Sequence, residues 1–283
     1  MKVELIANKT NSAVADFLSR APLNESILAL DGMGVNSAYH YFVLSALGFE
    51  RLTQLNRLIA ISAANFPTLF FTAMATGHAK WTVDDLIKWD VANRKAHGVS
   101  TLRSLPAFVG WKLGMPFAQI VKPGGFSEAL KLIVSEAFLA QTVSDLPIPL
   151  VTPLYDKTTG ELCLVSRENP ELSDMPLSVL VNSAPSIEGI FAPIKFKTRT
   201  FVDPIFSPVA KGLIKRLTGD TKNALVSSLV TERREENRIY MRPHDAKNGQ
   251  NLFLKDLILF LGNLPNKSIY RAAKAGLTHK MVP

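Results

Sequence analysis

The chain has 283 residues, of which 47% are hydrophobic and 20% charged, and its formal net charge is +8 at pH 7. This composition is typical of a globular protein and excludes a disordered one, and the length suits one large α/β domain. The single cysteine, Cys163, excludes an internal disulfide framework and a cysteine-rich metal site.

The first third of the chain alternates short apolar runs with glycine turns and helix-like stretches. The strand-like runs are 26–30 and 57–61, and the helix-like stretches that follow them are 38–47 and 63–76. The second of these helices should end at Gly77, since glycine commonly closes a helix. This order of strand, glycine turn, helix, strand, sharp turn and helix predicts a parallel sheet with crossover helices.

Less regular structure is expected further along the chain. The pattern predicts helices at 82–95 and 127–141, an irregular cap over a pocket at 102–125, and a hairpin of strands at 149–155 and 161–166. Residues 206–283 have a mostly helical and basic pattern. We therefore expect a single domain over 1–283, with a core at about 24–210 and a mostly helical, basic part at about 211–283.

Three short motifs, in order along the chain, have the residue types that acyl transfer needs. Ser62 follows an apolar run and precedes a helix, so a sharp turn would expose its hydroxyl at the positive end of that helix. The glycine loop at 31–34 can point backbone N–H groups at a developing oxyanion. Asp203, far downstream, can accept the serine proton in a two-residue relative of the catalytic triad.

These motifs make the sequence similar to the patatin-like phospholipase family over most of residues 26–206. The stretch DGMGVNS at 31–37 resembles that family's DGGGxRG oxyanion loop, and AISAA at 60–64 stands where the family has its GxSxG elbow. Residues 181–193 are similar to the family's SxAxPxxFxP segment, and FVDP at 201–204 matches the place of its DG[GA] motif. The resemblance implies an α/β, patatin-like three-layer fold with a mainly parallel central sheet and flanking helices.

The resemblance also implies a function, which is hydrolysis of lipid acyl esters by a serine acyl hydrolase. Ser62 would attack the acyl carbonyl, Asp203 would take the serine proton, and an acyl-enzyme would form. The oxyanion hole would consist of the loop residues Gly32, Met33, Gly34 and Val35. No cofactor and no metal are implied, and the expected partner is a lipid or another acyl-ester substrate.

The sequence departs from the family pattern at several positions of these motifs. They are Met33, Asn36 and Ser37 in the glycine loop, Ala60 and Ala64 in the elbow, and Pro204 after the aspartate. Alanine in place of glycine costs about 1 kcal/mol where φ must be positive, and proline fixes φ and removes an N–H. These departures leave open an inactive patatin-like scaffold that binds lipid or a protein partner. An acyltransferase that uses an acyl thioester also stays open, because it would use the same chemistry.

Histidines give no metal motif, because the five of them form no HxxxH or HExxH pair. A Ser-His-Asp triad would require His40 or His78 to lie near Ser62, whereas the family resemblance implies a dyad. The basic segments 211–216 and 267–280 suit either a surface that attracts anionic lipid or a solvated helix face.

Localisation is predicted from the N-terminus and from hydropathy. The first residues are charged and polar where a signal peptide needs an apolar run, and no stretch reaches the roughly 18 apolar residues of a membrane span. We expect a cytoplasmic protein without a signal peptide or transmembrane segment, with peripheral contact at a membrane surface. No nucleic-acid partner is expected, because no basic and aromatic motif of a known module is present. The oligomeric state stays open.

Overall fold

The computed structural model describes most of the first 241 residues. The described residues are 2–32, 37, 40–80, 127, 130–131, 133–187, 191–228, 233–234 and 236–241. They all belong to the first of the two units into which the chain divides, Met1–His244 and Asp245–Pro283. The helix predicted at 82–95, the cap predicted at 102–125 and the basic segment at 267–280 lie outside the described residues.

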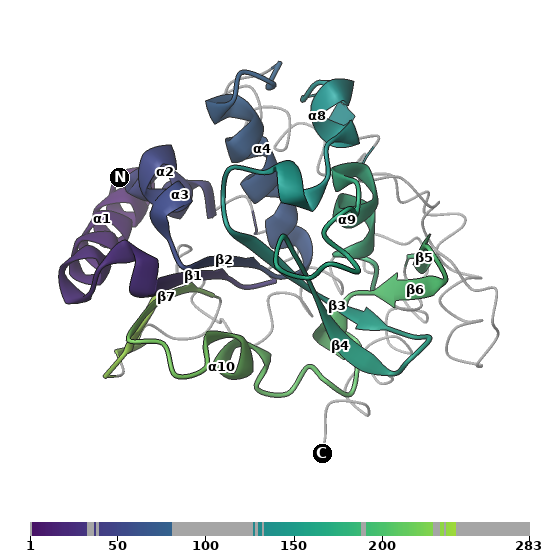
Figure 1. Ribbon diagram of the computed structural model, residues 1–283. Helices are drawn as coiled ribbons and strands as arrows, with labels where there is room; N and C mark the ends of the chain where they lie inside the picture. Colours follow the sequence, from purple (N-terminus) through teal and green to yellow (C-terminus); the bar gives the residue numbers. More distant parts are fainter. Residues whose placement is uncertain are drawn as a thin grey trace, which may run out of the picture. The chain divides into compact units, whose positions relative to one another are not determined.

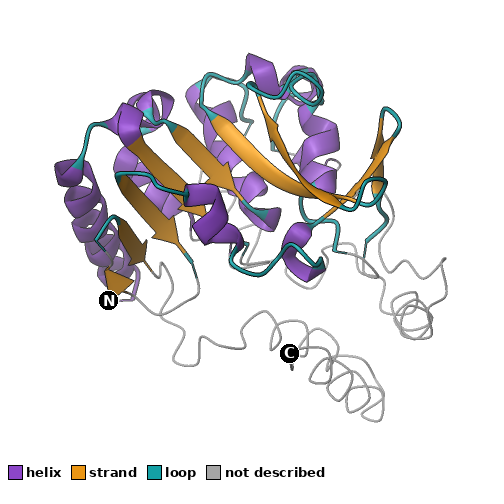
Figure 2. Cartoon of the chain, turned by 60° about the horizontal axis from the view of Figure 1, so that its bottom comes forward, coloured by secondary structure: helices purple, strands orange, loops and turns teal. Residues whose placement is uncertain are grey.

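A mixed sheet of nine strands organises the described part of the chain (Figures 1 and 2). The strand order is β5-β6-β3-β2-β1-β7-β9-β8, and β4 pairs with β3 outside this path. The strands are β1 (Ser26–Leu30), β2 (Arg57–Ala60), β3 (Leu150–Asp156), β4 (Glu161–Ser166), β5 (Ile194–Phe196), β6 (Arg199–Val202), β7 (Asn223–Ser227), β8 (Arg233–Arg234) and β9 (Arg238–Met241). The five central strands, β3, β2, β1, β7 and β9, are parallel, and the other pairings are antiparallel.

The central strands are buried on both faces, because helices pack on either side of the sheet. In β1, Leu28 and Leu30 belong to one apolar cluster, whereas Ile27 and Ala29 belong to the other. This alternation follows from the two-residue period of a strand. Buried strands of this kind are typical of parallel sheets in α/β proteins.

The helices divide unequally between the two faces in the described residues. They are α1 (Lys2–Arg20), α2 (His40–Leu47), α3 (Phe49–Gln54), α4 (Asn65–Ala75), α8 (Glu136–Ala140), α9 (Leu177–Ser183) and α10 (Leu213–Thr218), with short 3-10 turns η1 (Leu23–Glu25), η3 (Ser62–Ala64), η4 (Val143–Asp145) and η5 (Pro204–Phe206). Side chains of α1, α2, α3, α4, α8 and α9 join the larger cluster on one face. Only α10 among these helices packs against the other face, through Leu213 and Leu217.

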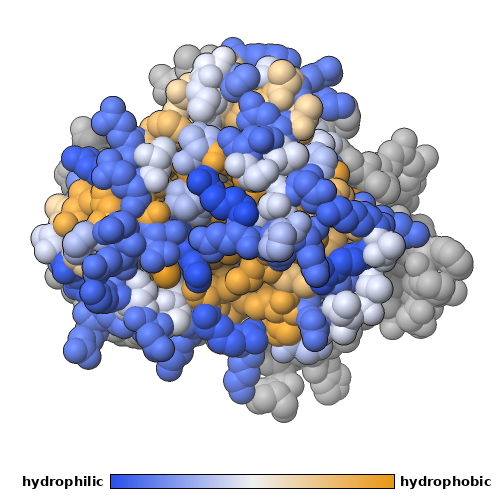
Figure 3. Space-filling model, viewed as in Figure 1, coloured by the Kyte–Doolittle hydropathy of each residue, from blue (hydrophilic) through white to orange (hydrophobic). Residues whose placement is uncertain are grey.

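The helix α10 buries its apolar side and exposes Lys215 and Arg216. This arrangement fits the interpretation of 211–216 as a solvated helix face that covers the core. Figure 3 shows hydrophobic side chains near α10 and β4 within a mostly hydrophilic surface. None of the helices in the described ranges combines the length and apolar character that a membrane crossing needs.

Several predicted elements are confirmed. The apolar runs at 26–30 and 57–61 form β1 and β2, which pair in parallel. The helix predicted from 63 to 76 consists of η3 and α4, and Gly77 follows it with φ of 76°. The predicted hairpin is the antiparallel pair of β3 and β4.

The single helix predicted over 127–141 is wrong in its middle. Val134 instead forms an isolated bridge with Ala79, and Ser135 has extended backbone angles. The Ser135 side chain accepts a hydrogen bond from the Phe138 N–H and thereby begins a new helix, α8. The sequence pattern missed this break because a serine within a helical pattern can equally well face solvent.

The mostly helical character predicted for the C-terminal part is wrong for its described residues. Between 211 and 241 there are one short helix, α10, and the strands β7, β8 and β9. The strand β7 lies directly beside β1, so the sheet extends beyond the predicted core limit of about 210. The helix α1, which precedes that core, also joins it through Val14 and Phe17. A five-residue strand buried on both faces shows no polar alternation that would distinguish it from a helix.

Candidate active site

Ser62 occupies a strained turn between a strand and a helix. The strand β2 ends at Ala60, Ile61 remains extended, and Ser62 has φ of 54° at the start of η3 and α4. A positive φ is uncommon for a residue other than glycine and costs about 1–3 kcal/mol. This is the geometry of a nucleophile elbow, which places a serine at the end of a strand and the start of a helix.

The two alanines of the elbow do not carry the strain. Ala60 is the last residue of β2, and Ala64 has φ of −64° in the ordinary helical region. Among the described residues other than glycine, only Ser62 and Lys197 have positive φ. The free-energy cost expected for alanine with positive φ therefore does not apply to Ala60 or Ala64, because Ser62 is the residue of the elbow that adopts the left-handed conformation.

The start of the glycine loop lies directly against Ser62. A Cβ added to Gly32 would lie 2.9 Å from the Ser62 Cβ and 2.8 Å from the Ile205 Cδ1. The Gly32 N–H donates a 2.8 Å hydrogen bond to Asp31 Oδ1. Gly32 thus provides space for the serine, and its predicted role as an oxyanion donor would require this bond to break. The other predicted oxyanion residues, Met33, Gly34 and Val35, lie outside the described residues.

Asp31 connects the glycine loop to the end of β7. Its N–H donates to the Ser227 carbonyl at 2.9 Å, and the Ser228 hydroxyl donates to its Oδ2 at 2.5 Å. Burial raises the pKa of Asp31, and the hydrogen bonds from Ser228 and Gly32 act in the opposite direction. Ser227 and Ser228 were missed by the sequence analysis because β7 was not recognised as a strand.

His40 supports the same loop rather than the serine. Its Nε2 lies 2.9 Å from the Asp31 carbonyl oxygen, and its Nδ1 lies 2.9 Å from Ser227 Oγ. A carbonyl only accepts, so Nε2 carries the proton and Nδ1 accepts from the Ser227 hydroxyl. Complete burial lowers the pKa of His40 to about 4, which keeps the ring neutral near pH 7.

His78, the other histidine considered for a triad, also forms its hydrogen bond with a residue other than Ser62. His78 Nδ1 lies 3.1 Å from Ser135 Oγ. Within the described ranges, neither His40 nor His78 is hydrogen-bonded to Ser62. The geometry of these ranges therefore fits a dyad better than a Ser-His-Asp triad.

Asp203 follows β6 and is 2% exposed. Its Oδ1 accepts the Ile205 N–H at 2.9 Å, while Oδ2 has no hydrogen-bond partner in the described part of the chain. Burial raises the pKa of Asp203 to about 7, and the charge of Asp31 adds to the rise. The Ser62 hydroxyl is near enough to act against this rise, although it does not form a hydrogen bond of ordinary length with Oδ2. Catalytic hydrogen bonds often tighten only when substrate binds.

Pro204 fits the loop that presents Asp203. It occupies the first position of η5, where a fixed φ suits the turn and the missing N–H is not needed. The Asp203 side chain caps this turn by accepting the Ile205 N–H. The loop thereby brings Ile205 against Gly32, so the proline is compatible with a packed site.

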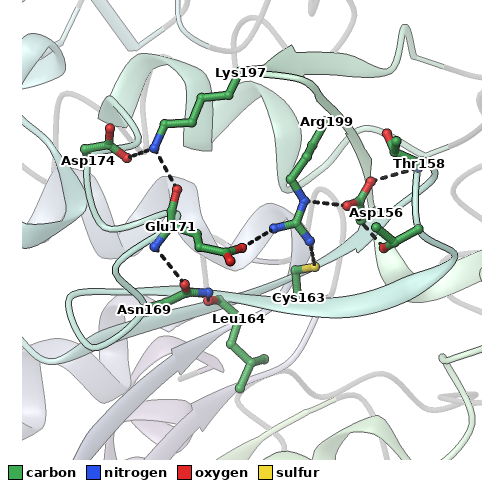
Figure 4. Close-up of polar contacts among 10 residues, drawn as sticks. Asp156, Thr158, Cys163, Leu164, Asn169, Glu171, Asp174, Lys197 and Arg199 are labelled. Atoms are coloured by element: carbon green, nitrogen blue, oxygen red, sulfur yellow. Dashed lines mark hydrogen bonds and ion pairs between the residues drawn. The ribbon is translucent and has the colours of Figure 1, made fainter.

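The partly buried guanidinium of Arg199 anchors the strand that leads to Asp203 (Figure 4). Arg199 donates from Nε to Asp156 Oδ2 at 2.6 Å, from Nη1 to Glu171 Oε2 at 2.9 Å and from Nη2 to Cys163 Sγ at 2.9 Å. Burial pushes the pKa of Asp156 up, but the hydrogen bonds from Arg199 and from the turn after β3 hold it below its usual range. This network ties β6 to the hairpin of β3 and β4.

The structure thus brings Ser62, Gly32 and Asp203 together at the end of the sheet where the parallel strands finish. Asp31, Ser62 and Ser228 follow the carboxyl ends of parallel strands, which is where α/β sheets commonly place their sites. In the described ranges, no group of three His, Cys, Asp or Glu side chains is arranged to hold a metal ion. No family model matches the chain, and no curated protein matches its sequence.

Proposed function

We propose that the chain is a serine acyl hydrolase of the patatin type, a divergent member of the patatin-like family with that family's three-layer fold. The observation that carries this proposal is the left-handed Ser62 at a strand-to-helix turn, with the buried Asp203 carboxyl beside it. A strained serine, and a buried carboxyl oxygen that has no partner within the described residues, are costly features, and such features cluster at active sites. The α/β architecture with a parallel centre supports the fold part of the proposal.

In the proposed reaction, Ser62 Oγ attacks the acyl carbonyl carbon while Asp203 Oδ2 takes the hydroxyl proton. A pKa of about 7 suits this role, because a general base works best when its pKa lies near the working pH. The oxyanion of the tetrahedral intermediate is held by backbone N–H groups from 33–35. The intermediate then collapses, the alcohol leaves with the proton from Asp203, and water hydrolyses the acyl-enzyme.

The proposed substrates are lipid acyl esters, and the proposed location is the cytoplasm with peripheral contact at membranes. No cofactor takes part in the proposed reaction, since the dyad and the loop supply the nucleophile, the base and the oxyanion donors.

The proposal is tested by comparing the wild-type protein with Ser62→Ala. Both are incubated with a fluorophosphonate probe, a short-chain p-nitrophenyl ester and phospholipid vesicles, and probe attachment and fatty-acid release are measured. We expect labelling at Ser62 and release by the wild type, and a loss of about 10⁴-fold or more in the variant. Ser183→Ala is the matched control, because Ser183 is buried in α9 and its hydroxyl donates to the Val179 carbonyl of the same helix.

Other outcomes separate the alternatives. A folded wild-type protein that neither binds the probe nor releases product would support the inactive scaffold. Product formation only when an acyl thioester and an acceptor are supplied together would support the acyltransferase. Equal activity in the wild type and Ser62→Ala would overturn the nucleophile assignment.

A further inference from the structure

Asn65 lies three residues after Ser62, and its side chain donates hydrogen bonds to two backbone carbonyls of the turn at Ser62. Asn65 is the first residue of α4 and is 1% exposed. Its Nδ2 donates to the Ala60 carbonyl at 3.0 Å and to the Ser62 carbonyl at 3.1 Å. Its backbone N–H also points to the Ala63 and Ser62 carbonyls at the end of η3. One side chain therefore joins the end of β2 to the strained serine.

Thr152 fixes the orientation of this amide from a neighbouring strand. The Thr152 hydroxyl, on β3, donates a 2.6 Å hydrogen bond to Asn65 Oδ1 and is completely buried. The two carbonyls on the other side accept only, so the NH₂ group must face them and the oxygen must face Thr152. A buried amide with partners at both ends is held in one orientation.

The two hydrogen bonds from Asn65 Nδ2 constrain the backbone around Ser62, which is the residue with positive φ. The Ala60 carbonyl belongs to the peptide before Ile61, and the Ser62 carbonyl belongs to the peptide after Ser62. Fixing both peptide planes limits the combined range of the Ile61 and Ser62 backbone angles, and the angles of Ser62 set the direction of its Cα–Cβ bond. Serine adopts the left-handed region rarely, so such a conformation persists only where its surroundings determine it.

We propose that Asn65 and Thr152 are positioning residues, which hold the turn so that the Ser62 hydroxyl stays aimed at the reacting carbonyl. The inference rests on the proposed role of Ser62 as the nucleophile, and it adds two residues that touch no substrate. A small misplacement of a reacting group costs about 100-fold in rate. Loss of the Asn65 and Thr152 hydrogen bonds should therefore lower kcat more than it changes substrate binding.

Thr152→Val and Asn65→Asp test the proposal. The first keeps the side-chain shape and removes the donor to the amide, and the second keeps the size and removes the donors to both carbonyls. Thr72→Val is the matched control, because Thr72 is a buried threonine of α4 whose hydroxyl bonds only the Thr68 carbonyl. For each protein, kcat, KM, the rate of fluorophosphonate labelling and the thermal midpoint are measured.

We expect Thr152→Val to lower kcat and the labelling rate by about 10-fold, with KM unchanged, and Asn65→Asp to lower them by about 100-fold. Thr72→Val should lose a similar amount of thermal stability and keep the wild-type rates. Wild-type rates in a folded Thr152→Val or Asn65→Asp protein would overturn the positioning role while leaving Ser62 as the nucleophile. A wild-type protein that neither labels nor turns over would overturn both proposals, since no reactive serine would then exist to be positioned.

Discussion

Gly32 and Ser62, which are thirty positions apart, lie in direct backbone-to-side-chain contact. A Cβ on Gly32 would lie 2.9 Å from the Ser62 Cβ, a distance that folded proteins essentially never show. The contact explains why glycine is required here even though the N–H of Gly32 is already bonded to Asp31. It also makes the loop after β1 and the elbow after β2 a single packed unit.

Gly32→Ala should therefore lower kcat by about 10- to 100-fold, because the added methyl group displaces Ser62 or the loop. The same change should cost about 1–3 kcal/mol in the free energy of unfolding. Steady-state kinetics and urea unfolding measure the two effects.

The double variant Gly32→Ala/Ile205→Val is the control for this prediction. Valine lacks the Cδ1 atom that would lie 2.8 Å from the new methyl group, so the double variant relieves one of the two contacts. We expect stability to recover in part and kcat to stay low. Full recovery of kcat would show that the contact with Ile205, rather than with Ser62, is the damaging one.

The activity should depend on the ionisation of Asp203. In the proposed reaction its carboxyl must be deprotonated to accept the Ser62 proton, and burial raises its pKa to about 7. The rate of ester cleavage should therefore rise as the pH increases through about 7 and level off above it. A rate that is already constant between pH 5 and pH 8, measured with kcat/KM, would contradict this assignment.

Asp203 should also make the folded state less stable as the pH rises. A raised pKa means that the folded protein holds the proton more tightly than the unfolded chain does. Stability is therefore lost between the unfolded value of 3.8 and about 7, by on the order of 4 kcal/mol. Asp203→Asn removes this dependence, so it should become more stable than the wild type towards pH 7. Urea unfolding of both proteins across this range measures the difference.

His40 should make the folded state less stable as the pH falls, which is the opposite of the effect of Asp203. Its lowered pKa means that the unfolded chain binds a proton more readily, so stability falls as the pH decreases from 6.5 to about 4, by on the order of 3 kcal/mol. His40→Gln can still donate to the Asp31 carbonyl and accept from Ser227, but it carries no proton. The stability difference between wild type and variant should shrink or reverse below pH 6. An unchanged difference would mean that the folded protein takes up the His40 proton as readily as the unfolded chain, which contradicts the lowered pKa of His40.

Removing the guanidinium of Arg199 should be strongly destabilising. Arg199→Met removes the ion-pair partner of the buried Asp156 carboxylate and leaves it with the hydrogen bonds from Thr158 and Thr159. Arg199 is partly exposed, so the loss should be up to about 3 kcal/mol. Arg199→Met/Asp156→Asn should recover much of this loss. Lys197→Met is the control, because Lys197 and Asp174 form an exposed pair that should contribute less than about 1 kcal/mol. Equal losses in the two single variants would contradict the role of Arg199 as the partner of a buried carboxylate.

The local pattern was sufficient to predict the elements around the site. Apolar runs followed by small residues predicted β1, β2 and the turn at Ser62, because strand periodicity and turn chemistry depend on neighbouring residues. The break at Ser135 and the strands β7 and β9 were missed, since a short buried segment has the same apolar pattern in a helix and in a strand. With β7 missing, the partners that Asp31 finds in Ser227 and Ser228 could not be anticipated.

The sequence by itself determined the chemical types at the proposed site, namely a serine after a strand, a glycine loop and a distant aspartate. Only the tertiary structure decided that the positive φ falls on Ser62 rather than on the alanines, and that Asn65 and Thr152 hold the turn. The reason is physical. Residue types and turn signals are local properties, whereas backbone strain, burial and the partners of a buried amide depend on which distant segments pack together.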